Sequence, residues 1–81
     1  LSAFSKLYSD QHAKYNIRMN NILPGFVDSL KTKEKFIRRI PLKRVGKVKE
    51  ISAMVSLLSS DEGSYITGQN IRIDGGITRS V

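Results

Sequence analysis

The chain has 81 residues, with 14 Lys and Arg against 7 Asp and Glu, a formal net charge of +7, one His and no Cys. This length allows one small domain at most, and the lack of cysteine excludes disulfides and thiol chemistry and fits a reducing cytoplasm. We expect no metal site on a lone His and no membrane segment, since no apolar stretch approaches the roughly 20 residues that a membrane helix needs. The positive charge leaves an acidic partner to be considered.

The first part of the chain predicts a helix and then a strand. Apolar residues at spacings of three and four indicate an amphipathic helix over residues 1–14. This helical pattern begins without an initiator Met or a capping residue, so we expect that something upstream is missing. Residues 17–23 are rich in branched side chains and stop at Pro24-Gly25, which is typical of a largely buried strand.

The middle of the chain is a polar connector followed by a helix. Residues 28–49 are strongly basic, contain a short helical segment at 34–39, and have the composition of a lid. From Val48 to Leu58 the apolar positions fall at helical spacing, which predicts an amphipathic helix. We expect Gly63 to end this helix in the left-handed conformation.

A second strand closes the chain. Apolar and polar residues alternate from Asn70 to Asp74, which predicts a strand with one wetter face. Tyr65 is expected to pack before the preceding turn, and Asp74 to hold a turn by accepting backbone N–H groups. Strand, long helical crossover and strand make a parallel βαβ unit. Ligands of such sheets bind at the carboxyl ends of the strands, here Pro24-Gly25 and Asp74-Gly75-Gly76, although Pro and Gly also stop ordinary strands.

Five segments in this order resemble the C-terminal third of the short-chain dehydrogenase/reductase family: I-R-M-N (17–20), P-G-F-V-D-S (24–29), P-L-K-R-V-G (41–46), Y-I-T-G-Q (65–69) and D-G-G (74–76). The resemblance implies an α/β fold, namely the C-terminal part of a Rossmann-type doubly wound parallel sheet in the order helix, strand, lid helix, helix, strand. It makes residues 1–81 a single partial domain, in which residues 28–47 form a substrate-lid connector.

The same resemblance implies a cofactor, NAD or NADP, at the end of the first strand. The positions that match the family's cofactor-binding motif are Pro24, Gly25, Phe26, Val27 and Ser29. The backbone of Val27 would meet the nicotinamide carboxamide. Ser29 stands where the family usually has Thr, so it keeps the hydroxyl but loses the methyl group that stiffens the rotamer.

The family's catalytic residues are absent from this chain. Its Tyr-x-x-x-Lys pair, in which the Lys lowers the pKa of a proton-transferring Tyr, has no counterpart, because the residues four positions after the tyrosines are His12, Met19 and Gln69. No G-x-G occurs either, so the Gly-rich phosphate loop is missing. We therefore assign no catalytic and no metal-binding residue, and we expect the catalytic Lys a few residues before Leu1.

The resemblance implies that the parent protein is an NAD(P)-dependent oxidoreductase. It would move a hydride between the nicotinamide and a small-molecule carbonyl or alcohol substrate, for example in the manner of a 3-oxoacyl carrier-protein reductase. We expect the 81 residues alone to be inactive, because they lack the acid/base pair and the cofactor loop.

The basic connector leaves alternatives open. Nine of the 14 basic residues lie within residues 31–49, where Glu34 is the only acid. They form either a solvated lid face or a surface that steers an anionic substrate carrier. A small polyanion-binding module is a further alternative, but nucleic acid is not expected, since only Phe36 is interleaved with the cations to stack on bases.

An assembly role is the remaining alternative. In the family, the helix from Val48 to Leu58 and the strand from Asn70 to Asp74 are elements through which subunits pair into dimers and tetramers. Two strands alone would leave a sheet edge and apolar faces exposed. We therefore expect a homo-oligomer, or a small basic oligomerisation module.

Overall fold

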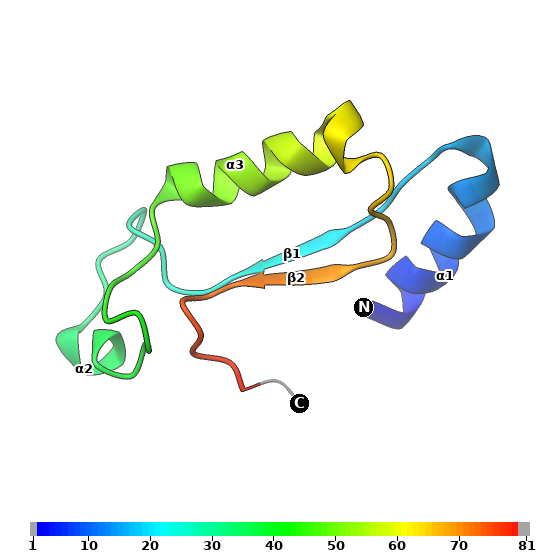
Figure 1. Ribbon diagram of the computed structural model, residues 1–81. Coiled ribbons are helices and arrows are strands. Elements are labelled where there is room, and N and C mark those ends of the chain that lie inside the picture. Colours follow the sequence, from blue (N-terminus) through cyan, green and yellow to red (C-terminus); the bar gives the residue numbers. More distant parts are fainter. Residues whose placement is uncertain (1, 80–81) are drawn as a thin grey trace.

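The computed structural model describes residues 2–79. Figure 1 shows helix α3 lying along one face of two strands, α2 beyond the end at which the strands finish, and α1 at the opposite end. The molecule is elongated, with extents of 46 × 25 × 20 Å. In chain order the elements are α1 (Ser2–His12), a 3-10 turn (Ala13–Tyr15), β1 (Asn21–Pro24), α2 (Glu34–Ile37), α3 (Val48–Ser59), a second 3-10 turn (Asp61–Gly63) and β2 (Asn70–Ile73).

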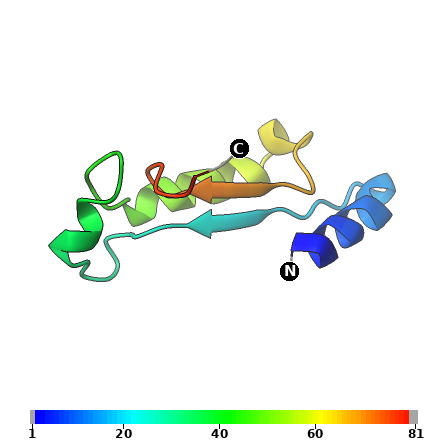
Figure 2. The ribbon, with the colours of Figure 1, turned by 90° about the horizontal axis from the view of Figure 1, so that it is seen from below.

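The two strands pair in parallel, as the strand–helix–strand order predicts. The register runs from Asn21 opposite Asn70 to Pro24 opposite Ile73, and Figure 2 shows the strands side by side with α3 running lengthwise behind them. The crossover returns the chain to the end of the sheet at which β1 begins. Both strands therefore finish at the same, opposite end. The predicted parallel βαβ unit is confirmed.

The first strand is shorter than predicted. The sequence predicts it over residues 17–23, but β1 begins only at Asn21. The preceding residues bind the turn before β2 instead: the Met19 N–H donates to Thr67 Oγ1 at 3.1 Å, and the Gly68 N–H donates to the Met19 carbonyl at 2.8 Å. These backbone groups are satisfied outside the ladder, so the branched run does not extend the strand.

The predicted helix from Val48 to Leu58 is confirmed as α3, but the expected role of Gly63 is wrong. The helix ends at Ser59, and the next residue, Ser60, has an extended backbone and donates its N–H to the Leu57 carbonyl at 3.1 Å. The positive-φ glycines are Gly68, Gly75 and Gly76. Gly63 is required for space, because a side chain there would overlap the Leu57 carbonyl.

Helix α1 packs by a different face from the one its apolar pattern predicts. Phe4 and Leu7 are 64% and 56% exposed, whereas Ser5 and Ser9 are buried. The Ser9 hydroxyl hydrogen-bonds the Thr67 hydroxyl at 2.7 Å. The serines allow the helix to approach the turn before β2 closely, and the apolar face is left open.

The apolar core of the unit is small. Among the described residues, the buried hydrophobic side chains are Ile40 and Leu58. Tyr65, expected to pack, is instead fully exposed. In the described part of the chain, no helix is both long enough and apolar enough to cross a membrane. The large exposed apolar residues leave much surface for further contacts.

A pair of glycine substitutions tests the close approach of the strand ends. An added Cβ at Gly25 would lie 2.8 Å from Asp74 Cβ and 3.0 Å from Asp74 Cα, whereas one at Gly46 would meet Val27 Cγ1 at an ordinary 3.6 Å. We expect Gly25→Ala to destabilise the complete protein by about 1–3 kcal/mol and the control Gly46→Ala to be near neutral. Denaturant unfolding measures both, and equal effects of the two variants would contradict this geometry.

Candidate functional site

The carboxyl ends of the two strands form one continuous edge. The Gly25 N–H donates to the Ile73 carbonyl at 2.9 Å, directly after the last strand pair. Gly25 and Asp74 then lie in close contact. The segments 25–29 and 74–76 therefore leave the sheet next to each other. The structure brings together the two strand ends that the sequence analysis expects to form a ligand-binding mouth.

A second parallel contact follows beyond β1. Val27 and Gly46 form an isolated parallel bridge, in which the Gly46 N–H donates to the Phe26 carbonyl and the Asp28 N–H donates to the Gly46 carbonyl, each at 2.9 Å. The bridge joins the two ends of the connector, so residues 28–46 form a loop with a closed base, which we call the lid. Sequence periodicity could not reveal this contact, because its partners are 19 positions apart.

The bridge leaves the backbone groups of Val27 pointing to one side. All described peptide bonds are trans, so the N–H and C=O of one peptide point in opposite directions. The Phe26 carbonyl and the Asp28 N–H both turn toward Gly46, and therefore the Val27 N–H and C=O both turn away from it. Within residues 2–79, the Val27 N–H has no partner and its C=O accepts only a long 3.4 Å bond from the Leu30 N–H.

A donor and an acceptor on one residue, facing the same way, suit a planar amide. A carboxamide offers a carbonyl oxygen that accepts from an N–H and an amino group that donates to a C=O. Val27 offers both complementary groups at the strand mouth. An unpaired N–H beside a weakly bonded C=O at the strand mouth makes this residue the first candidate for ligand contact.

The other predicted site residues surround Val27 in different ways. Pro24 is the exposed last residue of β1, and the exposed Ser29 hydroxyl makes no hydrogen bond within the described residues. Gly25 is required by its contact with Asp74. An apolar groove of about 290 Å³ lies beside this segment and is lined by Pro24, Val27, Val48, Ile51, Ser52 and Val55.

Phe26 joins the mouth to the lid. Its ring stacks on that of Phe36 in α2, with centroids 5.6 Å apart. The far side of the lid is held by Ile40, which is 2% exposed, and by the Leu42 N–H, which donates to the Gly75 carbonyl at 3.2 Å. Gly75 has a φ of +66° and no room for a side chain, because a Cβ would lie 2.7 Å from Ile40 Cγ2. The lid is thus anchored to both strand ends.

Asp74 holds the turn after β2, as predicted from the sequence. Its carboxylate accepts the Gly76 N–H at 2.9 Å and the Thr78 N–H at 3.3 Å. Hydrogen bonding by the Thr78 side chain and by the Gly76 N–H lowers the pKa of Asp74 below its ordinary value. The carboxylate is therefore occupied by the turn, and we assign it no catalytic role.

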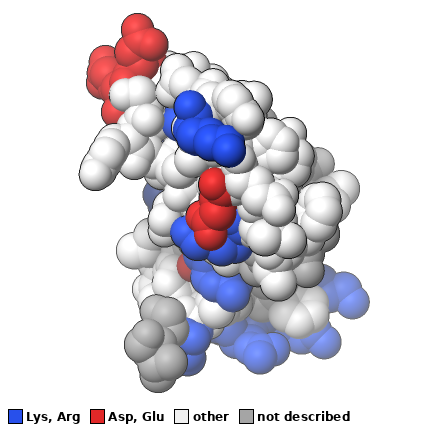
Figure 3. All heavy atoms as spheres, turned by 90° about the vertical axis from the view of Figure 1, so that its right-hand side faces the viewer, with Lys and Arg blue, Asp and Glu red and all other residues white. Residues whose placement is uncertain are grey.

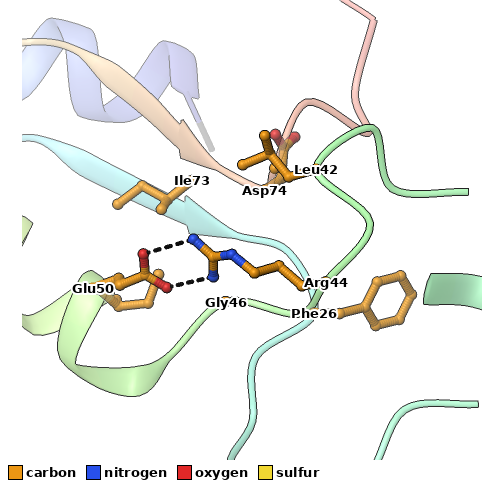
Figure 4. Close-up of a pocket in the computed structure, with 9 residues that line it drawn as sticks. Phe26, Leu42, Arg44, Gly46, Glu50, Ile73 and Asp74 are labelled. Carbon is orange, nitrogen blue, oxygen red and sulfur yellow. Dashed lines mark hydrogen bonds and ion pairs between the residues drawn. The ribbon is translucent and has the colours of Figure 1, made fainter. Parts of the chain in front are cut away.

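An ion pair closes the base of the lid on the side of α3. Arg44 donates to the two oxygens of Glu50 at 2.9 and 3.0 Å, and the Lys47 N–H also donates to Glu50, at 2.8 Å. The Arg44 hydrogen bond and then the Lys47 N–H lower the pKa of Glu50 to about 2. Figure 4 shows this pair beneath Ile73 in a pocket of about 80 Å³, with the Phe26 ring turned outward. The pair is structural, and the sequence analysis did not identify it.

Apart from Arg44, the cations of residues 31–49, which we call the lid region, form no ion pair within the described residues. Among the described residues, the ion pairs are Lys6–Asp10 and Arg44–Glu50. At the α1 end, opposite the lid, acidic groups are interspersed with basic ones (Figure 3). In the part of the chain that the structure describes, no cluster of His, Cys, Asp and Glu could hold a metal ion. The unpaired cations of the lid region are Lys31, Lys33, Lys35, Arg38, Arg39, Lys43, Lys47 and Lys49.

Comparisons with known proteins show the family to which the chain belongs. A family model described as Enoyl-(Acyl carrier protein) reductase matches residues 1–78. The chain superposes on YwfH, an NADPH-dependent reductase involved in bacilysin biosynthesis, with a TM-score of 0.89 and 38% identity over 100% of this chain and 37% of that one. It superposes on a short chain dehydrogenase from Bacillus anthracis with a TM-score of 0.86 and 34% identity over 94% of this chain and 32% of that one. The chain belongs to the short-chain dehydrogenase/reductase family and has part of its Rossmann fold.

Curated relatives match over nearly the whole chain. The 3-oxoacyl-[acyl-carrier-protein] reductase FabG of Thermotoga maritima is 41% identical over 80 residues, which are 90% of this chain and 32% of the relative. The NADPH-dependent reductase BacG of Bacillus subtilis is 37% identical over 95 residues, covering 95% of this chain and 37% of the relative. The chain therefore spans about a third of the length of the curated relatives that it matches.

The Arg44–Glu50 pair makes a testable prediction about pH. The folded pKa of Glu50, about 2, lies below the ordinary value of 4.5. The contribution of the pair to stability is therefore complete above pH 4.5 and lost as the pH falls toward 2. In the complete protein, we expect an NMR titration of the Glu50 carboxyl group to have its midpoint near 2, and Arg44→Met to move it up toward 4.5. A wild-type midpoint near 4.5 would contradict the pair.

Proposed function

We propose that this chain is the C-terminal, nicotinamide-facing part of an NAD(P)-dependent reductase that transfers a hydride between the nicotinamide and a carbonyl or alcohol substrate. The observation that carries the proposal is the Val27 backbone at the strand mouth, where the N–H is unpaired and the C=O accepts only a long 3.4 Å bond from the Leu30 N–H. The relatives named as NADPH-dependent reductases support it. The choice between NAD and NADP stays open.

In this proposal the chain orients the cofactor rather than performing proton transfer. Val27 donates to and accepts from the carboxamide, which sets the rotation of the nicotinamide ring. The Ser29 hydroxyl supplies a further donor, and Pro24 and the neighbouring groove give the ring an apolar wall. The nicotinamide supplies the hydride chemistry when it is bound, and holding its ring at one angle reduces the entropy lost on the way to the transition state.

The proposal includes a division of labour along a longer polypeptide. The Tyr-x-x-x-Lys pair and the Gly-rich phosphate loop are missing from these residues. The curated relatives are about three times as long. We likewise propose that residues 1–81 are a single partial domain and that the protein is cytoplasmic.

The proposed substrate is a 3-oxoacyl thioester on an acidic carrier. The FabG relatives are named for such substrates. The eight unpaired cations of the lid region stand beside the proposed nicotinamide position and are suited to attract a polyanion. A lid that is merely solvated, or a module that binds polyanions without catalysis, is the competing function.

Turnover assays test this function. We expect the complete protein to oxidise NADPH or NADH in the presence of a 3-oxobutanoyl thioester, and the isolated 81-residue chain to show no turnover. The Val27 amide resonance of the complete protein should shift when the cofactor is added, because its N–H gains an acceptor, while that of the bridged Gly46 should move less. Turnover by the isolated chain, or equal shifts of both amides, would contradict the proposal.

Salt dependence separates the carrier from the other lid functions. We expect reduction of the carrier-bound thioester to slow as the salt concentration rises and the lid cations are screened. The same acyl group on N-acetylcysteamine, which carries no polyanion, is the control and should be insensitive. Equal salt dependence of the two substrates would favour a solvated lid.

We also propose that the complete protein is a homo-oligomer that pairs through α3 and β2. Leu57 on α3, which does not line the groove, is 37% exposed, and the outer edge of β2 has no strand beside it in the described residues. Sedimentation of the complete protein should give a dimer or tetramer, and Leu57→Glu should shift it toward monomer. A monomeric wild type at high concentration would contradict the proposal.

A further inference from the structure

Asp28 is fastened by both its backbone and its side chain. Its N–H donates to the Gly46 carbonyl at 2.9 Å, which completes the bridge at the base of the lid. Its Oδ1 accepts the Val48 N–H at 3.1 Å. Since Val48 is the first residue of α3, the carboxylate ties the end of the strand segment directly to the start of the helix.

The contact supplies an acceptor that the local sequence of α3 lacks. The first N–H groups of a helix have no partner inside the helix, and the residue before α3 is Lys47, whose side chain has no oxygen to accept one. Asp28 provides the oxygen from 20 positions earlier in the chain. Its negative charge also lies at the favourable end of the helix dipole.

The position of Asp28 next to Val27 gives this contact a functional consequence. The Val27 C=O, the Asp28 N–H and the Asp28 Cα belong to one peptide plane, so bonds that hold the Asp28 N–H and restrict its Cα also restrict the direction of the Val27 carbonyl. The bridge to Gly46 consists of two backbone hydrogen bonds, and both are made to the far end of a long loop. The bond from the Val48 N–H adds a second attachment, to a 12-residue helix, which restricts rotation of that plane.

We propose that Asp28 is a positioning residue that holds the Val27 peptide at the angle needed to bind the nicotinamide carboxamide. This inference rests on the proposed function, because it needs Val27 to contact the cofactor. Asp28 itself does not touch the cofactor; it acts through the Val48 N–H. The base of the lid is thereby held still, so movement of residues 29–45 leaves the cofactor contact in place.

Three variants of the complete protein test the inference. Asp28→Ala removes the acceptor, Asp28→Asn keeps an amide oxygen at the same position, and Ser60→Ala removes a comparable bond, from Ser60 Oγ to the Leu57 carbonyl at 2.7 Å, at the other end of α3. We expect Asp28→Ala to raise the Kd for NADPH or NADH by up to about five-fold, the upper limit if the whole free energy of a typical cap is lost from the binding-competent Val27 conformation. Asp28→Asn should stay within about two-fold of wild type, and Ser60→Ala should lower the Tm without changing the Kd.

The outcomes separate this inference from the function on which it rests. A wild-type protein that binds neither dinucleotide overturns the proposed function. An unchanged Kd in Asp28→Ala, or equal Kd increases in Asp28→Ala and Ser60→Ala, overturns the positioning role while leaving the function in place. Amide NMR adds a readout that needs no ligand: Asp28→Ala should speed hydrogen exchange at the Val48 N–H and shift the Val27 resonance. If neither changes, the hydrogen bond between Asp28 and Val48 does not hold the Val27 peptide in place.

Discussion

The parallel bridge between Val27 and Gly46 is the contact on which the arrangement of the strand mouth depends. It carries the chain beyond the end of β1 and closes the base of the lid with two backbone hydrogen bonds of 2.9 Å. It also places the start of α3 next to Asp28, whose carboxylate accepts the Val48 N–H. It also turns both backbone groups of Val27 to one side. A single bridge therefore determines lid, helix start and candidate ligand contact together.

Polar contacts connect the elements of this unit, whose apolar core is small. Arg18 donates to the Leu58 carbonyl, at the last turn of α3, and the Ser9 and Thr67 hydroxyls join α1 to the turn before β2. Such bonds contribute about 1 kcal/mol each, whereas the buried apolar side chains are few. Specific pairing of this kind fixes the relative positions of the elements but leaves apolar faces exposed.

In the lid region, one cation forms an ion pair within the structure and the others form none. Arg44 is paired with Glu50, and this pair links the base of the lid to the first turn of α3. The other cations form no ion pair within residues 2–79, so they repel one another in the absence of a counter-charge. An acidic partner would relieve that repulsion, and the ion pair would keep the base of the lid in place as it did so.

The sequence by itself determined the features that depend on local spacing and on chain order. Helix α3 follows from its three- and four-residue periodicity, the parallel pairing from the long crossover between two strands, and the Asp74 turn from a short polar side chain beside glycine. Only the tertiary structure decided where β1 begins, which face of α1 packs, why Gly63 is needed, that Tyr65 is exposed, and that Asp28 reaches Val48. Each of these depends on a partner far away in the chain, and no local periodicity encodes which backbone groups such a partner will satisfy.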